Sequence, residues 1–270
     1  MSRRVTGRHA RAGLLALAAT ITLLAAATAP AQDAGATDAE ADATAEEAQV
    51  ATDRPRYFDL RRITPITGDP GRGKEKSELC SACHGQDGTS VVPIYPDIAG
   101  QSADYMYWQL VKFKDAGFGG TVMAVAVESL DEQDMRDLAL YYASLPYAGS
   151  PPEPGEDAEE PSDPALLARG EQLYLHGDPA AGIPPCQACH GADARGHPRA
   201  REVDAAGFTP YAAYPALRGQ RDAYLITRIG EYQDGKHTSL TTDFVMGGAA
   251  KHLDKASVEA LAAWLSSLPR

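Results

Sequence analysis

The chain has 270 residues, 44% of them hydrophobic, which suffices for one large domain or two small ones with separate cores. Its 37 acidic and 25 basic side chains give a formal net charge of −12 at pH 7. Because such a chain repels nucleic-acid phosphates and anionic lipid headgroups, we expect no nucleic-acid binding and no strong membrane association.

The first 31 residues have the pattern of a secretory signal peptide. Four arginines lie within the first 11 residues, and the apolar run at 14–27 is too short to span a bilayer. Ala29-Pro30-Ala31 then offers a small-x-small cleavage site. An uncleaved membrane anchor is the weaker alternative, because the run is short and rich in alanine and threonine. The sequence therefore predicts an exported protein.

Two acidic segments divide the rest of the chain. Residues 32–67 begin with alanine and scattered acids, without an aromatic residue before Tyr57, and this composition predicts a disordered leader. Residues 148–163 combine proline, glycine and acids, as extended linkers do. We expect two domains, at 68–147 and 164–270.

The two halves repeat one another. "CSACHG" at 80–85 returns as "CQACHG" at 186–191, and "YPDIAGQSADY" at 95–105 returns as "YPALRGQRDAY" at 214–224. The segments beginning "VM" at 122 and 245 also correspond, and both end in "SLP". The offset between equivalent residues rises from 106 to 119 to 123, so the second half carries 13 extra residues after its motif and four before its methionine. Duplication explains this better than chance.

Each half is expected to be mostly helical. Helices are predicted before each motif (71–79 and 164–176), near 102–115 and 221–234, and from N-caps at Asp131 and Asp254 to a terminal proline. No stretch shows sustained period-two alternation. We predict an all-α fold with long loops, and each shared methionine in a loop just before the last helix.

All four cysteines belong to the two Cys-x-x-Cys-His motifs. Structural disulfides with three possible pairings, a zinc site, or thioredoxin-like redox exchange are alternatives. None explains the histidine that directly follows the second cysteine in both copies. Haem c does, because two thiols add to the two vinyl groups of one porphyrin and the next residue supplies an imidazole to the iron. The sequence therefore predicts two covalently bound haem c groups, at Cys80 and Cys83 with His84, and at Cys186 and Cys189 with His190.

The sixth iron ligand decides what a haem can do. Methionine saturates the iron, raises its potential and leaves only electron transfer. Met123 and Met246 occupy equivalent positions, whereas Met106 and Met135 have no counterpart and suit core packing. Other candidate ligands, at positions that do not match between the halves, are Lys112, Lys114, His237, Lys251 and His252. We interpret His84 with Met123, and His190 with Met246, as the axial pairs.

These motifs resemble those of class I cytochromes c, and their pairing looks like the dihaem cytochrome c4 type of the bacterial periplasm. The resemblance implies two tandem monohaem class I domains. It also implies that Pro96 and Pro215 lend their carbonyls to the second ring nitrogen of His84 and His190, which would orient both imidazoles.

The resemblance implies a periplasmic electron carrier that works by outer-sphere transfer and is not itself an enzyme. Its partners would be other redox proteins, such as a terminal oxidase, a quinol-oxidising complex or a periplasmic dehydrogenase. A cytochrome subunit of a periplasmic dehydrogenase complex is the main alternative. A dihaem enzyme, such as a peroxidase or a thiosulfate-oxidising protein, is disfavoured by two matched methionines.

Overall fold

The computed structural model describes residues 57–115, 121–147 and 163–269. The predicted signal peptide, the leader up to residue 56 and the linker at 148–162 lie outside these described residues. All of the described residues belong to one compact unit. We call 57–147 the first half and 163–269 the second half.

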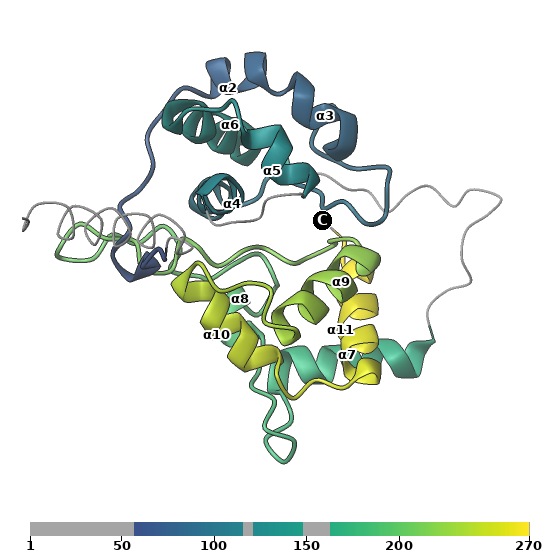
Figure 1. Cartoon of the computed structure of the whole chain (residues 1–270). Coiled ribbons are helices and arrows are strands. Elements are labelled where there is room, and N and C mark those ends of the chain that lie inside the picture. Colours follow the sequence, from purple (N-terminus) through teal and green to yellow (C-terminus); the bar gives the residue numbers. More distant parts are fainter. Residues whose placement is uncertain (1–56, 116–120, 148–162, 270) are drawn as a thin grey trace, which may run out of the picture. The chain divides into compact units, whose positions relative to one another are not determined.

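The fold is all-α, as predicted. After a short 3-10 helix, η1 (Leu60–Arg62), the first half contains α2 (Pro70–Lys76), α3 (Glu78–His84), α4 (Ala103–Asp115), α5 (Val122–Val127) and α6 (Glu132–Ser144). The second half contains α7 (Pro164–His176), α8 (Gln187–His190), α9 (Asp222–Gln233), α10 (Thr241–Ala250) and α11 (Lys255–Ser267). Figure 1 shows the first set in blue and teal and the second in green to yellow. Within the described ranges there is no strand, only two isolated bridges.

The predicted N-caps of the last helices are confirmed. The Asp131 carboxylate accepts the backbone N–H of Asp134, whose side chain accepts the N–H of Asp131 in return. Asp254 likewise accepts the N–H of Ser257. These bonds satisfy amide groups that have no partner inside the helix, and therefore fix where α6 and α11 begin.

In each half the last helix packs against the helix before the haem motif. A Cβ atom on Gly73 of α2 would collide with the carbonyl of Asp137 in α6, and one on Gly170 of α7 with the carbonyl of Ala260 in α11. Glycine is needed there because only its bare backbone allows so close an approach. Beside these crossings lie Tyr141 and Trp264, the latter 4.9 Å from the ring of Tyr174.

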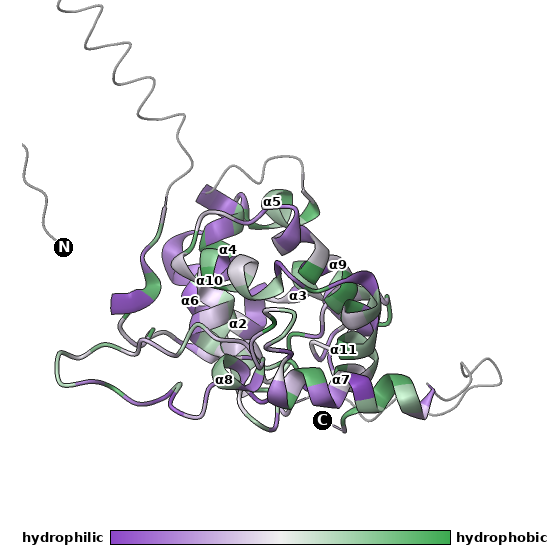
Figure 2. Cartoon of the chain, turned by 90° about the horizontal axis from the view of Figure 1, so that it is seen from below, coloured by the Kyte–Doolittle hydropathy of each residue, from purple (hydrophilic) through white to green (hydrophobic). Residues whose placement is uncertain are grey.

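Each half has its own apolar core. Met106 and Met135 are buried in the first core, as expected, together with Leu138 and Tyr142. The second core is built around residues such as Leu173, Leu261 and Trp264. Figure 2 shows α11 mostly green, whereas α6 carries more purple, polar residues. Among the described residues no helix is long and apolar enough to cross a membrane.

The expectation that Met123 and Met246 lie in loops is wrong. Met123 lies in α5 and Met246 in α10. Thr121 starts α5 by accepting the N–H of Ala124, and Asp243 accepts the N–H of Leu240 at the start of α10. These caps lower the cost of starting a short helix whose remaining residues are mostly small or apolar.

The predicted leader extends too far. Residues 57–66, which we call the strap, are folded and contact the second half. Phe58 exchanges backbone hydrogen bonds with Ser239 and Thr241, at 2.7 and 3.0 Å, and Ile63 accepts one from Thr209 at 2.8 Å. Leu60 and Ile63 are buried with Ala212, Ala213 and Leu240. Composition alone missed the strap because its partners lie far away in the sequence.

Candidate haem sites

Each Cys-x-x-Cys-His motif lies at the C-terminal end of a short helix. Cys80 and Cys83 lie in α3 with His84 at its end, and Cys189 and His190 end α8. A Cys-x-x-Cys spacing brings both thiols to one side of a helical turn. Gly85 follows at φ +76°, where a Cβ atom would collide with the carbonyl of Thr89. Glycine thus lets the chain turn sharply away from the histidine.

The two histidines are held alike. His84 and His190 are buried, and each Nδ1 lies close to a proline carbonyl, 2.8 Å from Pro96 and 2.9 Å from Pro215. Since a carbonyl can only accept, Nδ1 carries the proton and Nε2 keeps the lone pair that a metal ligand requires. Burial lowers the pKa of both imidazoles, and the carbonyls offset this in part. Both side chains therefore stay neutral at neutral pH.

No disulfide joins any of the four cysteines, so all four sulfur atoms are available for thioether bonds. Burial raises the pKa of Cys186 to about 11 and also raises the pKa values of Cys80 and Cys189. The surroundings of these three cysteines thus suit a neutral sulfur better than a thiolate. That environment fits sulfur bonded to a porphyrin more closely than sulfur acting as a nucleophile.

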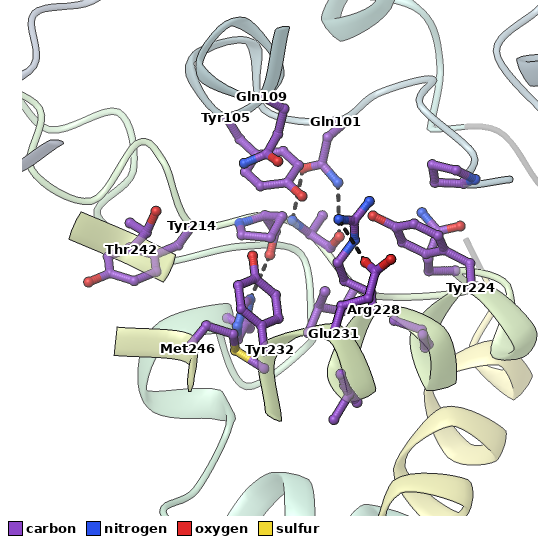
Figure 3. Close-up of a pocket in the computed structure, with 18 of the residues that line it drawn as sticks. Gln101, Tyr105, Gln109, Tyr214, Tyr224, Arg228, Glu231, Tyr232, Thr242 and Met246 are labelled. Carbon is purple, nitrogen blue, oxygen red and sulfur yellow. Dashed lines mark hydrogen bonds and ion pairs between the residues drawn. The ribbon is translucent and has the colours of Figure 1, made fainter. Parts of the chain in front are cut away.

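Both motifs open into one continuous cavity of about 980 Å³. Its walls include both Cys-x-x-Cys-His motifs, Met123 and Met246, and a mainly apolar lining that also contains Met106. Figure 3 shows Met246 beside Tyr232 at this cavity. Size, apolar walls, paired thiols and neutral imidazoles together fit two haem groups.

The other candidate ligands have different surroundings. Lys112 forms a fully buried ion pair with Asp243, 2.7 Å from Nζ to Oδ1, and Lys114 donates to backbone carbonyls. His237 lies within hydrogen-bonding distance of Arg228 and Glu231, and burial with two neighbouring cations lowers its pKa to about 4. Lys251 and His252 are exposed, although His252 borders the cavity.

One cavity residue escaped sequence reasoning. Arg228 is the only lysine or arginine among the described residues that line the cavity. Its side chain is 22% exposed, it pairs with Glu231 at 3.1 Å, and its buried Nε has no hydrogen-bond partner within the described ranges. Figure 3 shows Arg228 and Tyr224 on one side of the pocket, with Tyr105 and Gln109 reaching in from the other half. The repeat aligns Arg228 with Gln109, and that mismatch was a usable clue.

Comparison with known proteins agrees with this geometry. The cytochrome c family model matches the chain twice, over residues 71–146 and 167–269. Cytochrome c4 of Thiocapsa roseopersicina is 33% identical over 205 residues, which cover 76% of this chain and 95% of that protein. The chain belongs to the cytochrome c4 family. Reduced recombinant cytochrome c4 from Pseudomonas stutzeri has a similar structure, with a TM-score of 0.60 at 32% identity over 75% of this chain and all of that one.

A further relative of this cytochrome has a more specific name. The thiosulfate dehydrogenase electron acceptor of Thiomonas intermedia is 33% identical over 191 residues, or 70% of this chain and 78% of that protein. The present cytochrome has two tandem cytochrome c domains and carries electrons. Two haem c groups are covalently bound, one at Cys80 and Cys83 and the other at Cys186 and Cys189.

Proposed function

We propose that His84 and Met123 ligate the first haem iron and that His190 and Met246 ligate the second. The proline-oriented imidazoles and the position of both methionines on the cavity wall support this assignment. We further propose domains at 68–147 and 164–270, with the strap as an addition to the first. Two haems saturated in this way supply one-electron exchange between ferric and ferrous states.

The residues of this chain determine how such an exchange would proceed. His84 and His190 keep one tautomer because their Nδ1–H groups are occupied. A neutral histidine and a methionine held by the protein at each haem would leave no coordination site for water, and the apolar walls would reduce solvent rearrangement when the charge changes. This arrangement leaves no open position for peroxide or oxygen, so we infer a carrier and not an enzyme.

We place this carrier in the periplasm. The predicted signal peptide and haem attachment after export support that location. Its donors and acceptors are then other redox proteins of that compartment, including terminal oxidases, quinol-oxidising complexes and dehydrogenases. Outer-sphere transfer needs only close approach of the partners, without a shared substrate site.

A thiosulfate dehydrogenase is a second, more specific candidate for the donor. It is supported by the Thiomonas intermedia relative, whose name states that role. The observation that carries the general proposal is the matched pair of histidine–proline contacts, together with one methionine from each half on the wall of the same cavity.

Spectroscopy of the purified oxidised protein tests the ligands. Electron paramagnetic resonance is expected to show two low-spin ferric haems. The absorption spectrum is expected to show a methionine-to-iron charge-transfer band. A high-spin iron, or a mass equal to the apoprotein plus one haem, would overturn the carrier assignment. Rapid reduction of the cytochrome by a purified thiosulfate dehydrogenase with thiosulfate, followed by stopped flow, would support that enzyme as the donor. If a chemical reductant reduces the cytochrome but the enzyme with thiosulfate does not, the enzyme is not the donor.

A further inference from the structure

Two buried glutamines reach from each half into the other. The side-chain amide of Gln101 donates to the carbonyl of Ala216 at 2.9 Å and accepts the N–H of the same residue at 2.9 Å. Gln220 does the same with Asp97, at 2.9 and 3.0 Å. Both glutamines are only 6% exposed. Figure 3 shows Gln101 extending towards the second half, with its bonds dashed.

The peptides that these glutamines hold are the ones that hold the histidines. The carbonyl of Pro96 and the N–H of Asp97 belong to one peptide group, as do those of Pro215 and Ala216. His84 donates to one end of the first peptide, and the other end donates to Gln220. His190 and Gln101 are joined through the second peptide in the same way.

We propose that each glutamine is a positioning residue for the haem of the opposite half: Gln220 for His84, and Gln101 for His190. This rests on the proposed axial role of the two histidines. Hydrogen bonds in a chain polarise one another, so an acceptor on the peptide N–H makes its carbonyl a stronger acceptor. A stronger bond at Nδ1 makes the imidazole a more basic ligand. Basic ligands favour ferric iron, and each glutamine therefore lowers the potential of the other half's haem.

The orientation of both amides is determined by their surroundings. Each Oε1 accepts a second backbone N–H, from Ser102 in one case and from Arg221 in the other. The backbone of each glutamine is anchored in the same turn as the proline, through bonds from Gln101 to Ile98 and from Gln220 to Leu217. The two turns thus hold one another reciprocally. This accounts for the recurrence of both proline and glutamine in "YPDIAGQ" and "YPALRGQ".

The test uses the holoprotein and a mirrored pair of variants, Gln220→Met and Gln101→Met. Methionine keeps the length of glutamine but has no donor and only a weakly accepting sulfur. Gln220→Met should raise the potential of the first haem alone, and Gln101→Met that of the second alone. We expect about a threefold to tenfold shift in each reduction equilibrium, where tenfold equals 59 mV for one electron. Potentials come from spectroelectrochemistry, with each haem assigned through the loss of its methionine in Met123→Ala or Met246→Ala.

A second readout follows the histidines directly. In ¹⁵N-histidine-labelled reduced protein, Gln220→Met should move the Nδ1–H resonance of His84 upfield and leave that of His190 unchanged. Gln220→Glu keeps an oxygen acceptor opposite Asp97, so the first haem should not rise in potential. If the methionine variant fails to fold, Gln220→Glu and its mirror Gln101→Glu decide instead: a carboxylate is a stronger acceptor than an amide, so the Nδ1–H resonance of the histidine in the opposite half should move downfield while the other histidine is unchanged.

Three outcomes would overturn the inference. They are equal shifts at both haems, a shift only at the haem of the mutated half, and a rise in Gln220→Glu as large as in Gln220→Met. The carrier assignment would survive all three if the wild-type protein shows two low-spin, methionine-ligated haems. The carrier assignment itself would fail if the wild-type spectrum showed a high-spin or differently ligated haem.

Discussion

The two halves keep the same haem-holding parts and differ in what joins them. Thr209 and Ala212 lie in the stretch that holds the 13 extra residues of the second half, and Leu240 and Asp243 lie where the other four are inserted. Thr209 and Leu240 contact the strap. Ala212 accepts a hydrogen bond from Ser102, and Asp243 pairs with Lys112. Duplicated parts therefore build each site and exchange the reciprocal glutamine bonds, whereas the inserted parts add contacts between the halves that have no mirror image.

The two halves also differ at single aligned positions. The repeat sets Arg228 of the second half against Gln109 of the first. It also sets Asp137, a buried carboxylate in α6, against Ala260 in α11. The first difference places a charge at the cavity of the second half only. The second places a charge in the contact between α2 and α6, in the first half only. Each of these differences predicts a property that one half has and the other lacks.

Removing one proposed methionine ligand should have the largest effect and should stay within one half. Met246→Ala is expected to lower the potential of the second haem and open its iron to cyanide or carbon monoxide, because a soft thioether favours ferrous iron. Met123→Ala should do the same to the first haem. Met106→Ala is the control, with a loss of about 2–5 kcal/mol in stability but unchanged ligation. A wild-type spectrum and potential in Met246→Ala would show that another residue holds the iron.

Breaking the buried ion pair should weaken the contact between the halves. Lys112→Ala leaves the Asp243 carboxylate buried without its cation, and we expect a loss of about 3–5 kcal/mol in unfolding free energy. Denaturant unfolding followed by absorption measures this. Lys114→Ala, at an exposed side chain, should cost less than about 1 kcal/mol. Equal losses in the two variants would contradict a special role for the buried pair.

The strap can be tested with Leu60→Ala. Leu60 is 2% exposed and packs against Leu240, so truncation should cost about 2–3 kcal/mol. The neighbouring Arg61→Ala, at a 74% exposed side chain, should be close to neutral. Unfolding curves give both values, and a neutral Leu60→Ala would mean that the strap adds nothing to the fold.

The charge difference at the cavity should separate the two potentials. Arg228→Gln removes a cation that favours the ferrous, less positive iron, and we expect the second haem to become harder to reduce by about 1 kcal/mol. The reverse change, Gln109→Arg, should make the first haem easier to reduce. Redox titration of both variants measures these shifts. Unchanged potentials in both variants would show that the charge of Arg228 does not separate the two haem potentials.

Acid should affect the first half before the second. Asp137 accepts from Arg72, Gln133 and the N–H of Asp69, and the Arg72 bond lowers its pKa from 3.8 to about 2. Its stabilisation is therefore complete above about pH 4 and is lost as the pH falls through about 2. Hydrogen exchange should show α2 and α6 opening before α7 and α11. In Asp137→Asn this difference between the halves should disappear.

Local patterns along the chain were enough to predict the haem motifs and most of the helices. Cysteine spacing, the following histidine, the aspartate N-caps and the 3.6-residue periodicity all act over a few residues, so the motifs and most helices could be predicted. The leader boundary and the methionine loops could not, since they depend on caps and partners elsewhere. Only the tertiary structure decided that the strap packs on the second half, that Arg228 lines the cavity, and that Gln101 and Gln220 exchange bonds between the halves. The strap and glutamine contacts join residues more than a hundred positions apart, and no local pattern encodes such a pairing.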